Sequence, residues 1–395
     1  MGFLSGRLTF DRYHVVGDVP SQFGPEHLEI LDRYAIGKLE TTSLDQPDVG
    51  FLAGGHLFDV DFELEKNIIG EALHCGIRID TVNIPSAIRK AWLQMELNAL
   101  MADNPEARPS KAQRQEAKEA VEARCEEAAR SGRFRRMQPF SFLWDARESV
   151  LYFGASSPTA SEQFAGLFSL AFDLELERLT AGKIAERWAA EQKQLAAIND
   201  AAPAAFHTHD AAADIAWLNT QSGNLDFLGN EFLLWLWWYF ETESDTIQLA
   251  DKSEVTGMLA KTLSLECPRG ESGKETITAE SPVHLPEAAL AIRSGKLPRK
   301  SGMTLVRYGQ QYELVLQSET FSVSGAKIQV EAEDDEEGPG FLEERVEAIR
   351  GLSETLDLLY TSFCARRFAK SWGRELEQMR HWLQAAPANK KKPAA

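Results

Sequence analysis

The sequence has few cysteines and no long apolar run. Its four cysteines, Cys75, Cys125, Cys267 and Cys364, are scattered without a CxxC or Cys/His ligand spacing, so neither a disulfide framework nor a zinc site is indicated. The longest apolar run, residues 232–240, is far shorter than the roughly 20 residues that span a bilayer. The N-terminus also lacks the regions of a secretory signal. We therefore expect reduced thiols and a cytoplasmic protein.

The charge is acidic overall but uneven along the chain. The 395 residues carry a formal net charge of −18, which argues against a protein that binds DNA over its whole surface. Residues 108–136, however, hold nine Lys and Arg against five Glu, and residues 281–316 hold five against two Glu. Residues 26–65 hold ten acids and two bases. This asymmetry predicts a cationic surface, best used in a concave or enclosed DNA site, on an otherwise acidic protein.

Residue patterning predicts an α+β fold with antiparallel sheets and long helices. Strands are expected at 3–10 and 56–64, in a hairpin of 140–144 with 150–155, and in a meander of 304–308, 312–317 and 321–331. Helices are expected from about residue 25, over 87–101 and 110–130, after Pro158, from about residue 230, over 286–293 and over most of 341–384.

These elements suggest a division of the chain into regions. We expect an N-terminal α+β region (1–102), a long helix with a hairpin and a second helix (103–200), and a tryptophan-rich helix with a β-meander (201–332). C-terminal helices (341–385) and a basic tail (386–395), expected to be disordered, complete the chain.

Residues 111–179 hold the most informative combination of motifs. Ser110 is the expected N-cap of a helix on which Lys111, Arg114 and Lys118 share one face, by their i, i+3, i+7 spacing. The helix ends in Gly-Arg-Phe-Arg-Arg at residues 132–136, and a hairpin and an apolar helix follow. A basic helix and a basic turn are thus joined to a folded body.

This order of elements resembles the RdgC family of bacterial recombination-associated proteins. The similarity also extends to the Ile-Pro-Ser step at 84–86, to AIRSGK at 291–296 with the strand pair that follows it, and to the helix around 352–363. It covers most of the chain in order, and the sequence is identified as a divergent and longer relative of the family. Gly132 stands where the family has an arginine, and Lys274 alone stands for a basic gate.

The resemblance implies an RdgC-like fold in which two subunits meet at both ends and form a ring around duplex DNA. Region 103–200 would supply the contact at the tip of the ring. The implied function is sequence-independent DNA binding that modulates homologous recombination by restraining the access of RecA to DNA. The implied protein is a nucleoid-associated homodimer without enzymatic activity, cofactor or membrane.

The residues expected to contact DNA are all cations. They can neutralise phosphates without reading bases, so affinity should fall steeply with salt. No helix-turn-helix, zinc finger or RNP pattern is present to read a sequence. The expected DNA-binding residues are Lys111, Arg114, Lys118, Arg133, Arg135, Arg136, Lys274, Arg293, Lys296, Arg299 and Lys300.

Three aromatic residues are candidates for the contact between subunits. Phe134 can stack on a base or dock into the second subunit, and we expect the subunit contact. Trp235 and Trp238 belong to a tryptophan-rich helix, which suits either a buried core or a subunit interface. We include both in the expected dimer contact.

Two other classes of function stay open from the sequence alone. The acidic exterior and the aromatic helix fit an interaction or scaffold protein of a mobile element or defence locus. His207 and His209 stand two residues apart and, with Asp210 or Asp214, can hold one metal ion, as in a metal-dependent nuclease. Their setting is an alanine-rich linker, and no Ser/His/Asp signature or nucleophile elbow occurs. We therefore expect no metal and no catalytic residue.

Overall fold

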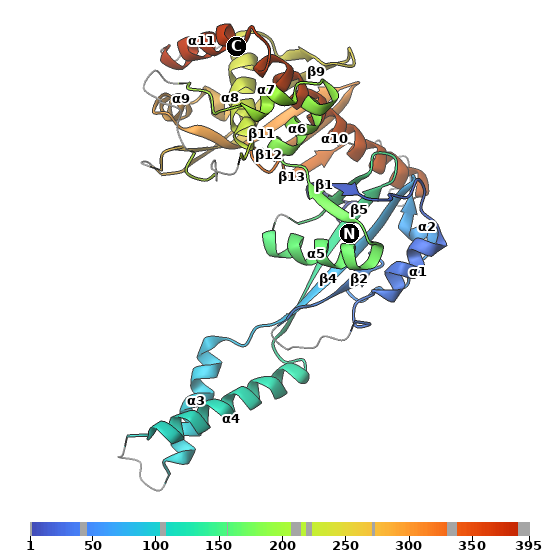
Figure 1. Cartoon of the computed structure of the whole chain (residues 1–395), viewed down its shortest axis with the longest axis vertical. Helices are drawn as coiled ribbons and strands as arrows, with labels where there is room; N and C mark the ends of the chain where they lie inside the picture. The colour runs from blue at the N-terminus through green and yellow to red at the C-terminus, as the bar shows by residue number, and fades with distance from the viewer. Residues whose placement is uncertain are drawn as a thin grey trace, which may run out of the picture.

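The computed structural model describes residues 2–39, 46–102, 108–155, 157–206, 215–218, 223–270, 273–329 and 338–385. In these residues the chain forms a large antiparallel sheet with helices packed against it, and a helical hairpin extends away from the body (Figure 1). The expected α+β class with antiparallel strands is confirmed.

The sheet is continuous from one half of the chain to the other. Its main path runs β10-β9-β11-β12-β13-β1-β6-β5-β4-β2, with β3, β7 and β8 pairing beside it. Strand β1 joins the halves, because its start pairs with β13 and the rest of it with β6 and β7. The strands are β1 (Leu8–Val16), β2 (Asp48–Leu52), β3 (Ile68–Ile69), β4 (Ala72–Val82), β5 (Arg135–Asp145), β6 (Val150–Phe153), β7 (Glu175–Arg178), β8 (Thr246–Gln248), β9 (Glu254–Glu266), β10 (Glu275–Ala279), β11 (Leu297–Arg307), β12 (Gln310–Gln317) and β13 (Val323–Ile328).

The helices gather in three places (Figure 1). α5 lies beside the N-terminal half of the sheet, α6 to α11 surround the C-terminal half, and α3 and α4 form the projecting hairpin. None of the described helices is long and apolar enough to cross a membrane. The helices are α1 (Pro25–Arg33), α2 (Leu64–Asn67), α3 (Ser86–Leu100), α4 (Lys111–Arg130), α5 (Pro158–Phe172), α6 (Ala181–Glu191), α7 (Leu195–Asn199), α8 (Phe227–Thr242), the 3₁₀ turn η2 (Pro282–His284), α9 (Pro286–Arg293), α10 (Pro339–Arg367) and α11 (Trp372–Gln384).

The core of the N-terminal half forms between α5 and the sheet. Phe164 and Phe168, one helical turn apart on α5, are fully buried. Phe164 stacks on Phe153 of β6 at 4.3 Å between ring centroids, and Phe168 meets Trp144 of β5 at 5.0 Å. The apolar spacing that predicted this helix is therefore the face that it buries.

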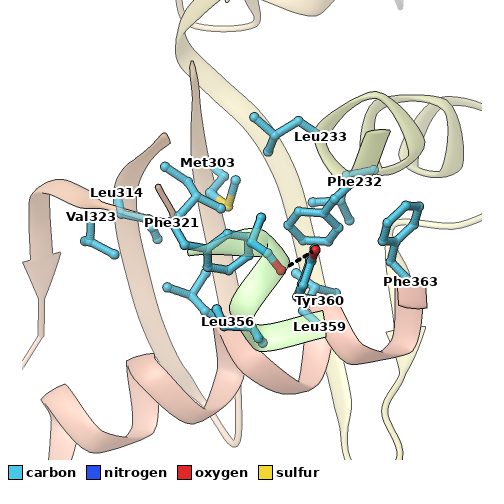
Figure 2. Close-up of a cluster of buried hydrophobic side chains, with 14 of the residues drawn as sticks. Phe232, Leu233, Met303, Leu314, Phe321, Val323, Leu356, Leu359, Tyr360 and Phe363 are labelled. Atoms are coloured by element: carbon cyan, nitrogen blue, oxygen red, sulfur yellow. Dashed lines mark hydrogen bonds between the residues drawn. The ribbon is translucent and has the colours of Figure 1, made fainter. Parts of the chain in front are cut away.

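The core of the C-terminal half is built by α8 and α10 against the meander β11 to β13. Figure 2 shows Phe232 of α8 and Tyr360 of α10 close together, and their rings are 5.2 Å apart, edge to face. The Tyr360 hydroxyl donates a 2.8 Å hydrogen bond to the carbonyl of Ala181 at the start of α6. A helix that is apolar on all sides, such as α8, suits this completely buried position.

α10 connects the two halves of the sheet through buried arginines. Arg12 of β1 makes a bidentate contact with Asp357 at 2.7 and 2.8 Å, and its side chain is fully buried. About two turns earlier on the same helix, Arg350 contacts Asp145 of β5 at 2.5 and 3.0 Å. Buried charges are tolerated where they are paired and hydrogen-bonded, as these are. From the other half, Arg307 of β11 contacts Glu354 of α10 at 2.8 Å, so α10 is bonded to strands of both halves.

One strand predicted from the sequence is wrong, and another is displaced. Residues 56–64 alternate in polarity but form no strand: a turn at 57–58 is followed by irregular chain up to α2. Asp59 accepts hydrogen bonds from the amides of Gly55 and Asp61, which favours local structure over a sheet ladder. The first strand begins at Leu8 rather than at Phe3. The region boundary drawn at 102 also separates α3 from α4, which belong to one hairpin.

The contact between α8 and the sheet makes a prediction about Gly229. A Cβ atom at this position would lie 1.8 Å from the carbonyl oxygen of Ser318, which is backbone and cannot turn away. We expect Gly229→Ala to destabilise the fold by about 3 kcal/mol or more. The exposed helical Gly166 of α5 has nothing within 4 Å of its Cβ position, so Gly166→Ala should stabilise by about 1 kcal/mol. Urea unfolding of both variants measures the two effects, and an unchanged midpoint for Gly229→Ala would contradict this packing.

Candidate nucleic-acid interface

Strands β4 and β5 carry helices α3 and α4 away from the body (Figure 1). They pair along their whole length, from Ala72 opposite Asp145 to Val82 opposite Arg135. Their neighbour β2 stops pairing at Asp80. Beyond that point no third described strand supports the ribbon. We call residues 81–136 the arm.

A small apolar cluster holds the helices together at the base of the arm. Its members are the buried Ile84, Val121, Cys125 and Ala128, with the partly buried Val82, Ile88, Trp92, Leu93 and Phe134 around them. The Arg124 side chain of α4 also contacts α3. Its guanidinium lies 5.3 Å from the Trp92 ring centre and 3.3 Å from the Glu96 carboxylate. The arm therefore has its own core, separate from the body.

Phe134 belongs to this cluster. Its ring packs edge to face against Trp92, at 6.4 Å between centroids, and its side chain is partly buried. Its backbone has φ of +64°, in the left-handed region that residues other than glycine rarely adopt. Part of the Phe134 side chain therefore packs within its own chain, where α4 turns into β5, and its role as a subunit contact stays a prediction.

The three cations predicted on α4 are exposed. The N-cap is confirmed: Ser110 Oγ accepts the Gln113 amide at 3.2 Å, and Gln113 Oε1 accepts the Ser110 amide at 2.9 Å, as in a capping box. Lys111, Arg114 and Lys118 follow this cap, and none of them makes an ion pair with another described residue. Their charges are available to an external anion.

The three arginines of the basic turn are not equivalent. Arg133 and Arg136 are exposed and make no ion pair with any residue that the structure describes. Arg135 instead lies between two carboxylates of the body, at 2.8 Å from Asp48 and 3.1 Å from Asp80. Arg133 lies over the ring of Phe134 at 5.7 Å but keeps its charge unpaired by any described carboxylate, as does Arg136, whereas Arg135 is engaged within the chain.

Two further cations of the arm were not predicted from the sequence. Arg89 and Lys90 lie on α3 and are exposed. With them, the described residues of the arm hold eleven Lys and Arg against six Glu, in a chain whose overall charge is −18. A charge count that started at the helix before the proline-rich loop, rather than after it, would have included them.

The second predicted group, at 293–300, is mostly used inside the chain. Lys296 is buried and contacts the Glu275 carboxylate. Arg299 lies 2.7 Å from Glu266 and 2.5 Å from Glu319. The prediction that these two side chains contact DNA is therefore corrected: they are paired with carboxylates of their own chain.

The remaining members of the second group differ in exposure. Arg293 donates a hydrogen bond to the carbonyl of Ala385 at the end of α11, so it too is occupied by its own chain. Lys274 and Lys300 are exposed. Neither belongs to the arm, so the structure does not gather the predicted cations into one surface.

Trp235 and Trp238 are core residues. Their exposed fractions are 0% and 3%, and Trp235 packs against Phe363 of α10 at 5.6 Å between ring centroids. The indole N–H of Trp235 donates to Glu375 of α11 at 3.3 Å. The predicted dimer contact through these two residues is corrected, because neither reaches the surface.

A further basic group lies on the outer face of the C-terminal half of the sheet. Arg7, Lys261 and Lys327 are exposed there and surround Glu313. The hydrogen bond from Lys261, with the charges of the other two, lowers the pKa of the Glu313 carboxyl. These cations come from distant parts of the sequence, so no local pattern could bring them together before the strands were paired.

The metal hypothesis falls outside the described part of the chain. His207, His209, Asp210 and Asp214 all lie beyond the described residues. Within those residues there is no group of three His, Cys, Asp or Glu side chains that could hold a metal ion.

The arm is thus the one place where several predicted cations remain exposed together on a projecting element of the described structure. No family model matches the chain, and no curated protein matches it significantly.

Proposed function

We propose that this protein binds duplex DNA without sequence preference through the cations of its arm. Lys111, Arg114, Lys118, Arg133 and Arg136 are exposed on one projecting element and make no ion pair with another described residue, which is the observation that carries the proposal. Contacts of lysine and arginine to phosphates supply affinity but no sequence information. The rest of the chain is acidic and would repel the phosphates, so DNA would be held at the arm.

The proposal extends to a dimer that modulates homologous recombination. In it, two subunits enclose duplex DNA in a ring and restrain the access of RecA, in the nucleoid and without an enzymatic step. Support for this part comes from the resemblance of residues 111–179 and 291–296 to the RdgC family. The arm extends away from the body, as a contact at the tip of a ring requires (Figure 1).

The test is a titration of two labelled duplexes of unrelated sequence, followed by fluorescence anisotropy. We expect equal affinities for the two duplexes and a loss of about a hundredfold or more between about 50 and 200 mM salt, since five phosphate contacts release their counterions. Strong preference for one sequence would contradict the proposal. Absence of binding at low salt would also contradict it and favour a protein-interaction role.

A further inference from the structure

Two carboxylates face each other at the point where the arm leaves the sheet. Asp48 of β2 and Asp80 of β4 are directly paired in register, at the last position that β2 supports. Their side chains are 17% and 1% exposed. Like charges in directly opposite positions of a sheet destabilise the pairing unless a cation compensates them. The base of the arm therefore requires positive charge from elsewhere.

Arg78 compensates one of these carboxylates within the body. Its guanidinium contacts both oxygens of Asp80 at 3.0 Å and donates to the carbonyl of Leu57 at 3.1 Å. The side chain is 10% exposed and also lies against the ring of Phe58. Arg78 therefore satisfies Asp80 from the side of the sheet but leaves Asp48 to another partner.

Arg135 of the arm is the partner of Asp48. It is the first residue of β5 and is paired with Val82, two residues beyond the last position that β2 reaches. Its NH2 group lies 2.8 Å from Asp48 and its Nε atom 3.1 Å from Asp80, so one side chain joins the arm to two strands of the body. A planar guanidinium that holds two carboxylates restrains direction as well as distance.

We propose that Arg135 is a positioning residue, which fixes the direction of the arm relative to the sheet and does not contact DNA. Beyond Asp80 the ribbon has two strands, and a two-stranded ribbon twists more freely than a wider sheet. The ion pairs of Arg135 restrain the ribbon where this freedom begins. The consequence for DNA binding rests on the proposed function, whereas the restraint itself exists in the free protein.

The neighbouring Arg136 is a matched control. It has the same side chain one residue further along β5, where alternation along a strand directs it to the other face of the ribbon. It is exposed and makes no ion pair with any described residue. Arg135→Ala and Arg136→Ala thus remove the same charge from adjacent positions, and only the first removes the link to the body.

The test measures the distance between arm and body by pulsed electron paramagnetic resonance in the absence of DNA. Spin labels at Ala123→Cys on α4 and Glu162→Cys on α5 occupy exposed positions, and the native cysteines are all buried. We expect one narrow distance distribution for the otherwise unchanged protein and for Arg136→Ala. Arg135→Ala should broaden it, and Arg135→Lys, which can hold one carboxylate at a time, should give an intermediate width.

A second readout separates positioning from DNA contact. With duplex DNA, Arg136→Ala should lower the slope of log affinity against log salt by about 1, whereas Arg135→Ala should leave the slope unchanged. An unbroadened distribution for Arg135→Ala, in a variant whose thermal melt shows a folded body, would overturn the positioning role. A slope lowered by Arg135→Ala would overturn the claim that it makes no DNA contact. If DNA does not bind at all, the proposed function fails, and the distance measurement still decides the inference.

Discussion

Replacing five exposed cations of the arm with alanine should lower the affinity for duplex DNA by about a hundredfold or more at 0.1 M salt, because each cation lost leaves about one phosphate unneutralised. The substituted residues are Lys111, Arg114, Lys118, Arg133 and Arg136. Alanine is the best helix former, so the three changes on α4 should preserve the helix. Fluorescence anisotropy with one labelled duplex measures the loss.

The control is a variant that loses the same charge from the body. Its five residues are exposed and make no ion pair with other described residues: Arg33, Lys193, Lys252, Lys370 and Arg374. A non-specific effect of net charge would weaken both variants equally. We expect the body variant to keep affinity within a fewfold of the unchanged protein, and equal losses in the two variants would contradict a DNA site on the arm.

Trp235→Ala should lower the free energy of unfolding by about 3–5 kcal/mol, as expected for removal of a large buried aromatic side chain. Trp235 is completely buried and packs between Tyr239 and Phe363, at 5.2 and 5.6 Å between ring centroids. The loss follows from the cavity and from the lost hydrogen bond to Glu375, whose carboxylate keeps its ion pair with Arg366. Urea denaturation at a fixed protein concentration measures it.

The same variant distinguishes a core residue from a subunit contact. Where Trp235 fills the core, the fall in stability should be the same at low and high protein concentration, and any oligomer should survive in the folded fraction. The exposed Leu290 of α9, 69% accessible, provides a control whose change to alanine should be nearly neutral. Dissociation of an oligomer by Trp235→Ala without loss of subunit stability would contradict the burial.

Local signals in the sequence predicted the elements that depend on local interactions. The capping residues of α4, the bounds of α9 and strand β12 agree closely with the structure, whereas β11 begins at Leu297, well before the predicted start at 304. Each of these elements is determined by residues within a few positions: a capping box, a proline at the first helical turn, or tight turns between strands. Alternating polarity alone did not predict the structure of residues 56–64, where the Asp59 side chain accepts hydrogen bonds from nearby backbone amides.

The candidate site depended more on long-range pairing. The exposure of Lys111, Arg114 and Lys118 agrees with their shared face on α4. Whether an arginine is free was not predictable, because Arg135 meets Asp48 across 87 positions of the sequence. In the same way, Arg299 meets Glu266 across 33 positions on a neighbouring strand. The charge of a side chain can be read from the sequence. Whether that charge is already paired within the chain depends on which strands lie side by side and in which register.

The most direct measurement is photocrosslinking from the arm to DNA. A benzophenone amino acid in place of Ala112 sits on exposed α4 beside Lys111, and one in place of Ser169 sits on the exposed side of α5 on the body. We predict that a labelled duplex crosslinks efficiently from position 112 and not from position 169, and that high salt removes the product. Crosslinking from position 169 with none from position 112 would show that duplex DNA lies against the body and contradict a DNA site on the arm.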